Sequence, residues 1–333
     1  MFQKKLKMLE NVGVIEVANF SKHEFQGPDA RKFLNYILAG RIPKIGRISL
    51  NPMLTPKGKL YGDLTVACLN ENRFIIFGSG AVQEMHRRWF ENHLRNFDVT
   101  YKNKSDDFHG LALSGPRSRD LLQKLVRENI SNENFKFRDV REMYVAGVPA
   151  IVNRISFTGE LGYEIYIAPH FLLKLYEEME AAGKEFNLKP FGGRALMSMR
   201  LEKNWGAWTL DFRPDFTAKE SGLDFFIDWN KDFIGKESAK KDTSKLKLTP
   251  LMIDTKDIDV TNNEAVVKDG KAIGYITSGG FAHYVKKSIA FSYIDEKILK
   301  TNNKFQVEIN GSFYECEIIK EPLYDPRGTK MRS

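Results

Sequence analysis

A change of pattern near residue 240 divides this chain into two unlike parts. Before it, strand-like runs mix with helix-like runs, whereas beyond it short strands follow one another with turns between them. The charged stretch Lys236 to Lys247 lies between the two parts and is typical of a solvated linker. We therefore predict an α+β body at residues 1–240 and an all-β domain, a barrel or a sandwich, at residues 245–333.

The expected elements follow from apolar periodicity and from the turn residues that bound each run. In the body, helices are expected at residues 29–38, 81–94, 117–126, 170–182 and 195–203, and strands at 12–17, 60–68, 73–77, 110–113, 150–156 and 163–167. In the second part, strands are expected at residues 251–253, 265–267, 271–277, 288–294, 304–309 and 312–319. No internal repeat is visible, which argues against a solenoid.

The composition is that of a folded globular protein. The chain has 333 residues, of which 42% are apolar and 28% charged, enough for two or three domains with sizeable cores. The net charge of +8 comes from basic residues that are dispersed among acids, which argues against a nucleic-acid partner and favours a small polyanion. Two cysteines, Cys68 and Cys316, exclude a disulfide framework and a four-cysteine zinc site, so we expect free thiols.

No segment of the sequence is typical of an export signal or a membrane span. The start, MFQKKLKMLENVGVIEV, is basic but has no apolar run of signal-peptide length before Glu10. No window approaches the roughly 18 uninterrupted apolar residues that a transmembrane helix needs. We therefore expect a cytoplasmic protein with no membrane partner.

Several common catalytic motifs are missing from the sequence. Gly78-Ser79-Gly80 follows a strand and opens a helix, but Gln83 stands where a dinucleotide fingerprint has its third glycine. There is no Walker motif and no Gly-x-Ser-x-Gly elbow. The six histidines include His86 and His93 on one expected helix, but no third ligand accompanies them, so no metal site is predicted.

Two carboxylates and one arginine stand out as candidate site residues. Asp63 lies inside a strand-like segment, where Asp is disfavoured; the alternative is an edge strand or a bulge beside Gly62. Glu160 lies at a glycine-flanked turn between two apolar strands, where an ordinary exposed acid is the alternative. Arg200 belongs to an Arg-Leu-Glu stretch on an expected helix, where a solvated face is the alternative.

Aromatic residues accompany these candidates along the sequence, with core packing as the alternative explanation. A flat heterocycle is bound by aromatic stacking and by a carboxylate that accepts two parallel N–H bonds. The residue chemistry therefore favours a site for a flat, amino-substituted heterocycle. The aromatic residues are Tyr61, Phe157, Tyr163, Trp205 and Trp208.

Several segments, in order along nearly the whole chain, resemble the family of the glycine cleavage T-protein, or aminomethyltransferase. They lie at residues 111–117, 154–165, 199–203, 232–237 and 274–280. Further segments are similar to the folate-binding C-terminal half of dimethylglycine and sarcosine dehydrogenases; they lie at residues 53–58, 205–215 and 322–327. Those enzymes carry an N-terminal flavin domain, and this chain starts at the folate half. We therefore expect it to need a separate flavoprotein, or not to oxidise a substrate.

The resemblance implies a three-domain cloverleaf in which two α+β folate-binding lobes enclose a channel and a C-terminal β-barrel completes the molecule. It also implies roles for single residues. Asp63 matches the catalytic aspartate near the reactive nitrogens of the folate, and Glu160 the acid that clamps the pterin. Arg200 matches an arginine near the folate site. Tyr163 is expected to form a wall of that site, and Tyr61 is expected to be among the residues that bind the cofactor.

Two differences narrow the function within the resemblance. The T-protein has two consecutive aspartates where this chain has Gly62-Asp63, which weakens the case for a lipoyl-protein donor. The iron–sulfur repair branch has a cysteine where alignment on Gly235 and Glu237 places Asp232, which argues against that activity.

The function that the resemblance implies is tetrahydrofolate-dependent transfer of a one-carbon unit. The donor would be a small methylated amine, oxidised by a partner flavoprotein, or an aminomethyl group on a lipoyl carrier protein. The excess of Lys and Arg would attract a polyglutamylated folate. The alternatives are a folate-dependent demethylase of a sulfonium or methoxy compound and a non-catalytic folate-binding subunit.

Overall fold

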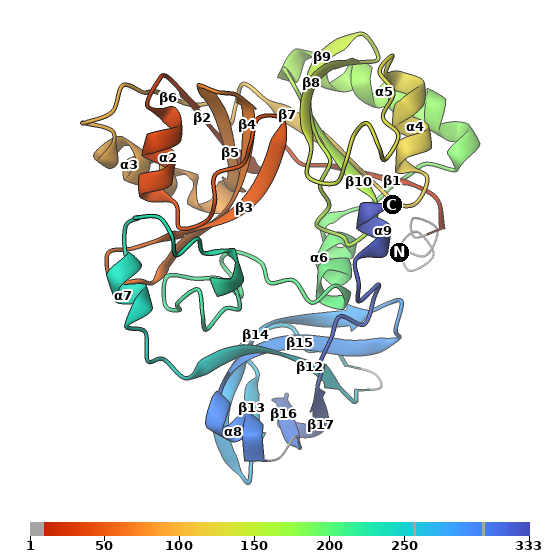
Figure 1. The fold of residues 1–333 in the computed structure, drawn as a ribbon. Helices are drawn as coiled ribbons and strands as arrows, with labels where there is room; N and C mark the ends of the chain where they lie inside the picture. Colours follow the sequence, from red (N-terminus) through yellow and green to blue (C-terminus); the bar gives the residue numbers. More distant parts are fainter. Residues whose placement is uncertain (1–9, 256–257, 302–303) are drawn as a thin grey trace.

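The computed structural model describes residues 10–255, 258–301 and 304–333. Figure 1 shows three units grouped around a common centre: a sheet with helices within residues 20–103, a second sheet with helices mostly within residues 109–202, and a barrel within residues 246–318. A long irregular segment, drawn in teal, connects the second unit to the barrel.

The first unit is a five-stranded antiparallel sheet with two helices. The sheet has the order β3-β4-β5-β2-β6. Its strands are β2 (Phe20–Gln26), β3 (Arg47–Leu54), β4 (Leu60–Asn70), β5 (Arg73–Ser79) and β6 (Thr100–Asn103). The helices are α2 (Ala30–Ile37) and α3 (Gln83–His93), which pack on one face through a shared apolar core.

The second unit is a six-stranded sheet of order β11-β1-β7-β10-β9-β8. Its strands are β1 (Gly13–Glu16), β7 (His109–Ser114), β8 (Val140–Val145), β9 (Val148–Asn153), β10 (Gly162–Ile167) and β11 (Lys189–Pro190). Its helices are α4 (Ser118–Leu125) and α5 (Leu172–Gly183), which cover one face, and α6 (Gly193–Glu202), which contacts the barrel.

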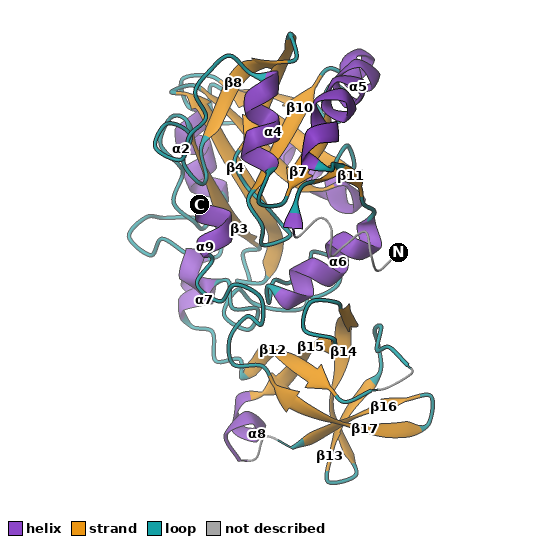
Figure 2. Ribbon diagram, turned by 90° about the vertical axis from the view of Figure 1, so that its right-hand side faces the viewer, coloured by secondary structure: helices purple, strands orange, loops and turns teal. Residues whose placement is uncertain are grey.

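Side chains alternate along every strand, so each sheet has one face against its helices and one face without helices. The two sheets pack against each other through the faces without helices. Along β4, Leu64 and Val66 face the helices of the first unit, whereas Ala67 faces the second sheet. Between the sheets, Phe77 stacks on Tyr166 with ring centroids 4.6 Å apart. The helices therefore lie on the outside of a two-sheet core, as Figure 2 shows.

The third unit is a closed six-stranded barrel of order β12-β15-β14-β13-β16-β17, which decides between the barrel and the sandwich expected from the sequence. Closure pairs every edge of the sheet and leaves none exposed. The strands are β12 (Leu246–Ile253), β13 (Ala265–Lys268), β14 (Lys271–Ala282), β15 (Lys287–Asp295), β16 (Phe305–Ile309) and β17 (Ser312–Ile318), with helix α8 (Glu296–Thr301) after β15.

The prediction of a linker at Lys236 to Lys247 is wrong for both ends of that segment, which belong to a helix and a strand. A short helix, α7 (Lys236–Lys240), begins after Gly235, whose φ of 86° is the left-handed conformation that glycine adopts easily. Lys236 forms an ion pair with Asp232 at 2.9 Å. Strand β12 then begins at Leu246. The lysines made the segment look like a flexible linker, although they lie on the outside of regular structure.

Strand β2 was not expected from the sequence because its interior is polar. Lys22, His23 and Glu24 are all buried, and each has a partner. Nζ of Lys22 donates to the carbonyl of Ala18 at 2.6 Å, and Nε of Arg73 donates to Glu24 at 2.8 Å. Buried polar groups are tolerated when they are paired, so partners from distant segments make this strand possible.

The chain beyond the barrel returns to the second unit and ends in helix α9 (Thr329–Arg332), after which the carbonyl of Ser333 accepts a hydrogen bond from Arg154. Nζ of Lys203 donates to the carbonyl of Asp325, at 2.5 Å. Among the described residues, no helix combines the length and the apolar character needed to cross a lipid bilayer.

Candidate functional site

The strand register places two carboxylates in the space between the two sheets. Thr65 pairs with Phe77, and Phe77 stacks on Tyr166 of the facing sheet. Asp63 lies one step along β4 from Thr65 and Glu164 one step along β10 from Tyr166. Because side chains two residues apart share a face, both carboxylates point into the space between the sheets.

Both carboxylates lie at the same end of that space. Phe20 pairs with Ser79, which lies two residues after Phe77 on β5. Asp63 is displaced from Thr65, the partner of Phe77, by two residues in the same direction along the sheet. Phe20 also lines a cavity together with Glu164. With β4 and β2 separated only by β5, Asp63 lies about 10 Å across the sheet from Phe20.

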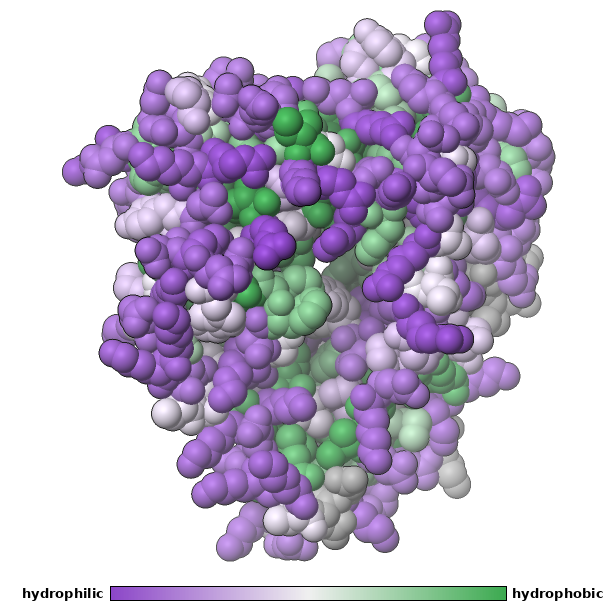
Figure 3. Space-filling view, in the orientation of Figure 1, coloured by the Kyte–Doolittle hydropathy of each residue, from purple (hydrophilic) through white to green (hydrophobic). Residues whose placement is uncertain are grey.

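The cavity around Glu164 is mostly apolar and aromatic, with a few hydroxyl groups. Such a lining suits a flat ring that is held by stacking and by a small number of polar contacts. Figure 3 shows that the face of the molecule seen in Figure 1 is hollowed near its centre, where the three units meet. Besides Glu164, the lining includes Phe20, Phe157, Phe191, Ser114, Ser156 and Thr158.

Asp63 and Glu164 share an unusual electrostatic state. Burial raises the pKa of Asp63 to about 7, against the opposing effect of its own backbone N–H. Burial likewise raises the pKa of Glu164 to about 7, although the hydroxyl of Tyr166 donates to Glu164 at 2.8 Å. Both side chains nevertheless keep some accessible surface, as groups that line an enclosed space do. At neutral pH each carboxyl can therefore hold or release a proton.

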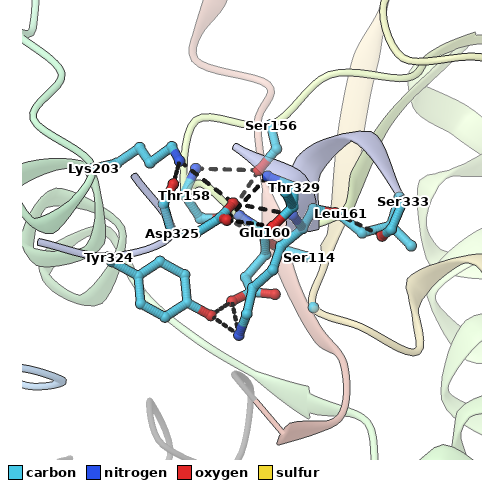
Figure 4. A network of polar contacts seen from close by, with 12 residues as sticks. Ser114, Ser156, Thr158, Glu160, Leu161, Lys203, Tyr324, Asp325, Thr329 and Ser333 are labelled. Atoms are coloured by element: carbon cyan, nitrogen blue, oxygen red, sulfur yellow. Dashed lines mark hydrogen bonds and ion pairs between the residues drawn. The ribbon is translucent and has the colours of Figure 1, made fainter. Parts of the chain in front are cut away.

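Glu160 lies outside the set of described residues that line this cavity. Figure 4 shows the hydroxyl of Tyr324 pointing at its carboxylate, to which that hydroxyl donates a hydrogen bond. Nζ of Lys330 lies 3.7 Å from the same oxygen. Burial raises the pKa of Glu160 to about 7, while Lys330 opposes the rise. Its contacts therefore join the turn before β10 to the C-terminal segment.

Tyr61 and Tyr163 also point away from the space between the sheets. The ring of Tyr61 packs on α3, with its centroid 4.5 Å from that of Trp89. Tyr163 is fully buried under α4 and α5, and its ring centroid lies 5.9 Å from that of Phe135. Tyr163 and Glu164 are consecutive in β10, so their side chains take opposite faces.

Arg200 is buried at the junction of three segments. Its Nη1 donates to Asp211 at 2.6 Å and to the carbonyl of Trp205 at 3.1 Å. Asp211 also accepts hydrogen bonds from the hydroxyls of Thr277 and Ser278 on β14, at 2.5 and 2.7 Å. Arg200 thus ties α6 to the segment 205–212 and to the barrel.

Of the residues predicted from the sequence, Asp63 faces the space between the sheets and Phe157 lines the cavity there, and the structure adds Glu164. The signal that selected Asp63, an acid inside a strand, is also present at Glu164 within GYEIYI. Among the described residues, no group of three or more His, Cys, Asp or Glu side chains is arranged to hold a metal ion.

We expect the free energy of unfolding to fall as the pH rises from about 4 to 7. Carboxyls in an unfolded chain titrate near pH 4, whereas Asp63, Glu160 and Glu164 titrate near 7 in the fold. The folded chain therefore holds extra protons in this window, and stability is lost as they leave. Thermal unfolding at pH 5 and pH 8 measures the fall.

Asp63→Asn, Glu160→Gln and Glu164→Gln should each flatten this fall, because the amide cannot ionise. Glu178→Gln on the exposed side of α5 is the matched control and should leave the difference between pH 5 and pH 8 unchanged. A wild-type midpoint that is equal or higher at pH 8 would contradict the electrostatic description.

Comparisons with known proteins agree with this architecture. Residues 3–231 match the GCVT N-terminal domain, and residues 247–325 match the glycine cleavage T-protein C-terminal barrel domain. The chain belongs to the glycine cleavage T-protein family. The resemblance seen in the sequence segments is thereby confirmed.

Relatives in this family include both short and long proteins. The aminomethyltransferase of Desulfitobacterium hafniense (strain Y51) is 30% identical over 322 residues, which cover 95% of this chain and 87% of that protein. Human mitochondrial dimethylglycine dehydrogenase is 35% identical over 334 residues, which cover 98% of this chain. The chain spans only 38% of that longer relative.

A crystal structure of the glycine cleavage system aminomethyltransferase T from Bartonella henselae shares the fold. Its TM-score is 0.87 at 20% identity, with 98% of this chain and 90% of that chain covered. The expected T-protein fold, mixed α/β sheets followed by a closed β-barrel, is thereby confirmed.

Proposed function

We propose that this protein transfers a one-carbon unit to tetrahydrofolate, with the space between the two sheets as the active site. The observation that carries the proposal is the pair Asp63 and Glu164, two enclosed carboxyls at one end of that space. Two such groups are unusual in a purely structural core, because burying a carboxyl is costly, and buried acids with raised pKa values cluster at functional sites. Membership of the T-protein family supports the same chemistry.

The residues that line the cavity are of the kinds that contact a pterin ring. Phe20, Phe157 and Phe191 supply flat apolar surface, and Glu164 supplies a carboxylate. An ionised carboxylate can accept two parallel N–H bonds from an amino-substituted ring, which fixes its orientation. We propose Glu164 for this role, because Glu164 lines the cavity and Glu160 is not among the described residues that line it.

Asp63 would act on charge and protons near the reacting atoms. Bound tetrahydrofolate would supply the nitrogen that accepts an electrophilic carbon, and positive charge would develop on that nitrogen as the bond forms. The Asp63 carboxylate can stabilise that charge and hold a released proton, since its pKa of about 7 suits both states. Enclosure between the sheets strengthens this electrostatic effect by excluding water.

The donor that we propose is a small methylated amine such as dimethylglycine or sarcosine, oxidised by a flavoprotein partner. Support comes from the relative named dimethylglycine dehydrogenase, which extends well beyond the part that this chain matches. Product analysis tests the reaction type: transfer from an oxidised amine yields methylene-tetrahydrofolate, whereas direct demethylation yields methyl-tetrahydrofolate.

Calorimetric titration with tetrahydrofolate tests the binding site. We expect Glu164→Gln to weaken binding by about 1.5–3 kcal/mol, or roughly 10–100-fold, because a charge-assisted pair of bonds is lost. Glu160→Gln is the matched variant, since the sequence alone assigned the clamp to Glu160. It should keep the affinity and lower thermal stability, because its contacts hold the C-terminal segment.

Loss of binding in Glu160→Gln with full affinity in Glu164→Gln would return the clamp to Glu160. A wild-type chain that does not bind tetrahydrofolate would contradict the proposed function as a whole.

A further inference from the structure

His86 lies directly behind the strand segment that carries Asp63. It belongs to α3, is 1% exposed, and its Nε2 donates to the carbonyl of Tyr61 at 2.9 Å. Because the acceptor is a carbonyl, the ring proton is on Nε2. Burial lowers the pKa of His86 to about 4, so the ring is neutral throughout the pH range in which Asp63 titrates.

The hydrogen bond from His86 to Tyr61 is made at a position where the pairing of β4 with β3 is irregular. Gly62 pairs with Met53 and Leu60 with Leu54, which leaves Tyr61 as an extra residue between two paired ones. Such a bulge redirects the strand and the side chains that follow it, and it is often found beside active sites. A bulged residue lacks the regular ladder bonds that fix its neighbours, so another partner must fix its carbonyl.

Gly62 provides the space that this contact needs. A Cβ atom at position 62 would lie 3.2 Å from Nε2 of His86 and 3.1 Å from Cγ of Leu64. Both distances are tighter than ordinary van der Waals contact, so a side chain there would press against the histidine. Because Gly62 has no side chain, the buried ring of His86 can approach the strand closely enough to bind the carbonyl of Tyr61.

The ring of His86 is itself held from several sides. Its centroid lies 6.3 Å from the ring of Tyr61, 6.3 Å from Phe90 and 6.1 Å from Trp208. The titratable neighbour on β2 is His23, 6.4 Å away and also neutral, because burial lowers the pKa of His23 to about 3. A neutral ring packed on all these sides can serve as a fixed support.

We propose that His86 is a positioning residue for Asp63: its Nε2–H holds the bulge at Tyr61, which fixes the direction in which the Asp63 carboxyl enters the space between the sheets. This role rests on the proposed function of Asp63 in one-carbon transfer. His86 does not touch the reacting atoms. It acts through the backbone of Tyr61 and Gly62.

The test uses the pH dependence of thermal unfolding of the whole chain, measured from pH 5 to pH 8. For each variant, the contribution of Asp63 is the difference between that variant and the same variant carrying Asp63→Asn. The readout follows the ionisation of Asp63, so it needs neither tetrahydrofolate nor a donor.

His86→Leu keeps much of the bulk but removes the donor. We expect it to move the Asp63-dependent fall in stability to lower pH by about one unit, because a released strand lets the carboxyl turn toward water. His86→Gln, whose amide nitrogen can take the place of Nε2, should restore the wild-type window. Gly62→Ala should shift the window in the same direction as His86→Leu, because its Cβ displaces the ring.

His23→Leu is the matched control, since His23 is equally buried but pairs with Tyr101 instead of β4. It should lower stability at every pH without moving the Asp63 window. An unmoved window in His86→Leu, or an equal shift in His23→Leu, would overturn the positioning role. Failure of the wild type to bind tetrahydrofolate would reject the proposed function and leave this comparison intact.

Discussion

Asp63→Asn should lower the rate of one-carbon transfer by about 10²–10⁴-fold while changing the affinity for tetrahydrofolate less than about twofold. The amide has nearly the same shape as the carboxyl, so packing between the sheets is preserved. It carries no negative charge and cannot take up a proton, so it cannot stabilise positive charge that develops near it. A loss confined to turnover is the signature of a group that acts in the transition state.

The pH profile provides an independent measure of the same role. With the pKa of Asp63 at about 7, the wild-type rate should rise between pH 6 and pH 8 as the active carboxylate forms. Asp63→Asn should lose this rise and give a flat, slow profile. The rate is measured as methylene-tetrahydrofolate formed from sarcosine or dimethylglycine in the presence of a flavoprotein dehydrogenase.

Asp107→Asn serves as the control for this experiment, because Asp107 is exposed and paired with Lys104 at the surface. It should keep the wild-type rate and the wild-type pH profile. If Asp63→Asn turns over as fast as the wild type, the assigned role of Asp63 is wrong, whatever its effect on folate binding.

The sequence predicts Asp63 as a site residue for a physical reason, and the structure places it in a strand that faces an enclosed space. An acid in the middle of an apolar strand must either face a special environment or disrupt the strand. The sequence leaves open a functional role for Asp63 and, as the alternative, an edge strand or a bulge beside Gly62. The structure does contain a bulge, at Tyr61 of β4, two residues before Asp63. The proposed role of Asp63 and the bulge beside it are therefore compatible explanations of the same segment.

Glu164 meets the same rule as Asp63, because it is an acid inside an apolar strand, whereas Glu160, which is predicted from the sequence, lies in the turn before that strand. The glycines around Glu160 make the turn conspicuous, whereas the strand period of β10 tells which acid faces the first sheet. The partners of Glu160, by contrast, come from Tyr324 and Lys330, far along the chain. No local pattern predicts such a return of the C-terminal segment.

Polar segments buried by distant partners account for much of what the sequence could not show. The expected strands at residues 60–68 and 73–77 are apolar and local, and β4 and β5 confirm them. Strand β2 and the contacts of Arg200 depend instead on residues that only the fold brings near. Apolar periodicity is a property of a segment, whereas pairing of a buried charge is a property of the whole molecule.

Arg200→Met should lower the free energy of unfolding by about 3–5 kcal/mol, because it leaves the buried carboxylate of Asp211 without its cation. Arg200 and Asp211 are 1% and 0% exposed at their side chains, so water cannot replace the lost partner. The effect is measured by urea denaturation. Arg87→Met is the matched control, since Arg87 pairs with Glu84 and Glu91 at the surface and should cost far less.

A second substitution separates loss of the ion pair from loss of packing. Asp211→Asn keeps an oxygen that can accept from the hydroxyls of Thr277 and Ser278, but it removes the charge. Arg200→Met combined with Asp211→Asn should therefore be more stable than Arg200→Met alone, although it carries one change more. If the double variant is the less stable of the two, Arg200 stabilises the junction of α6, the segment 205–212 and the barrel through packing, and the unpaired charge is not the cause.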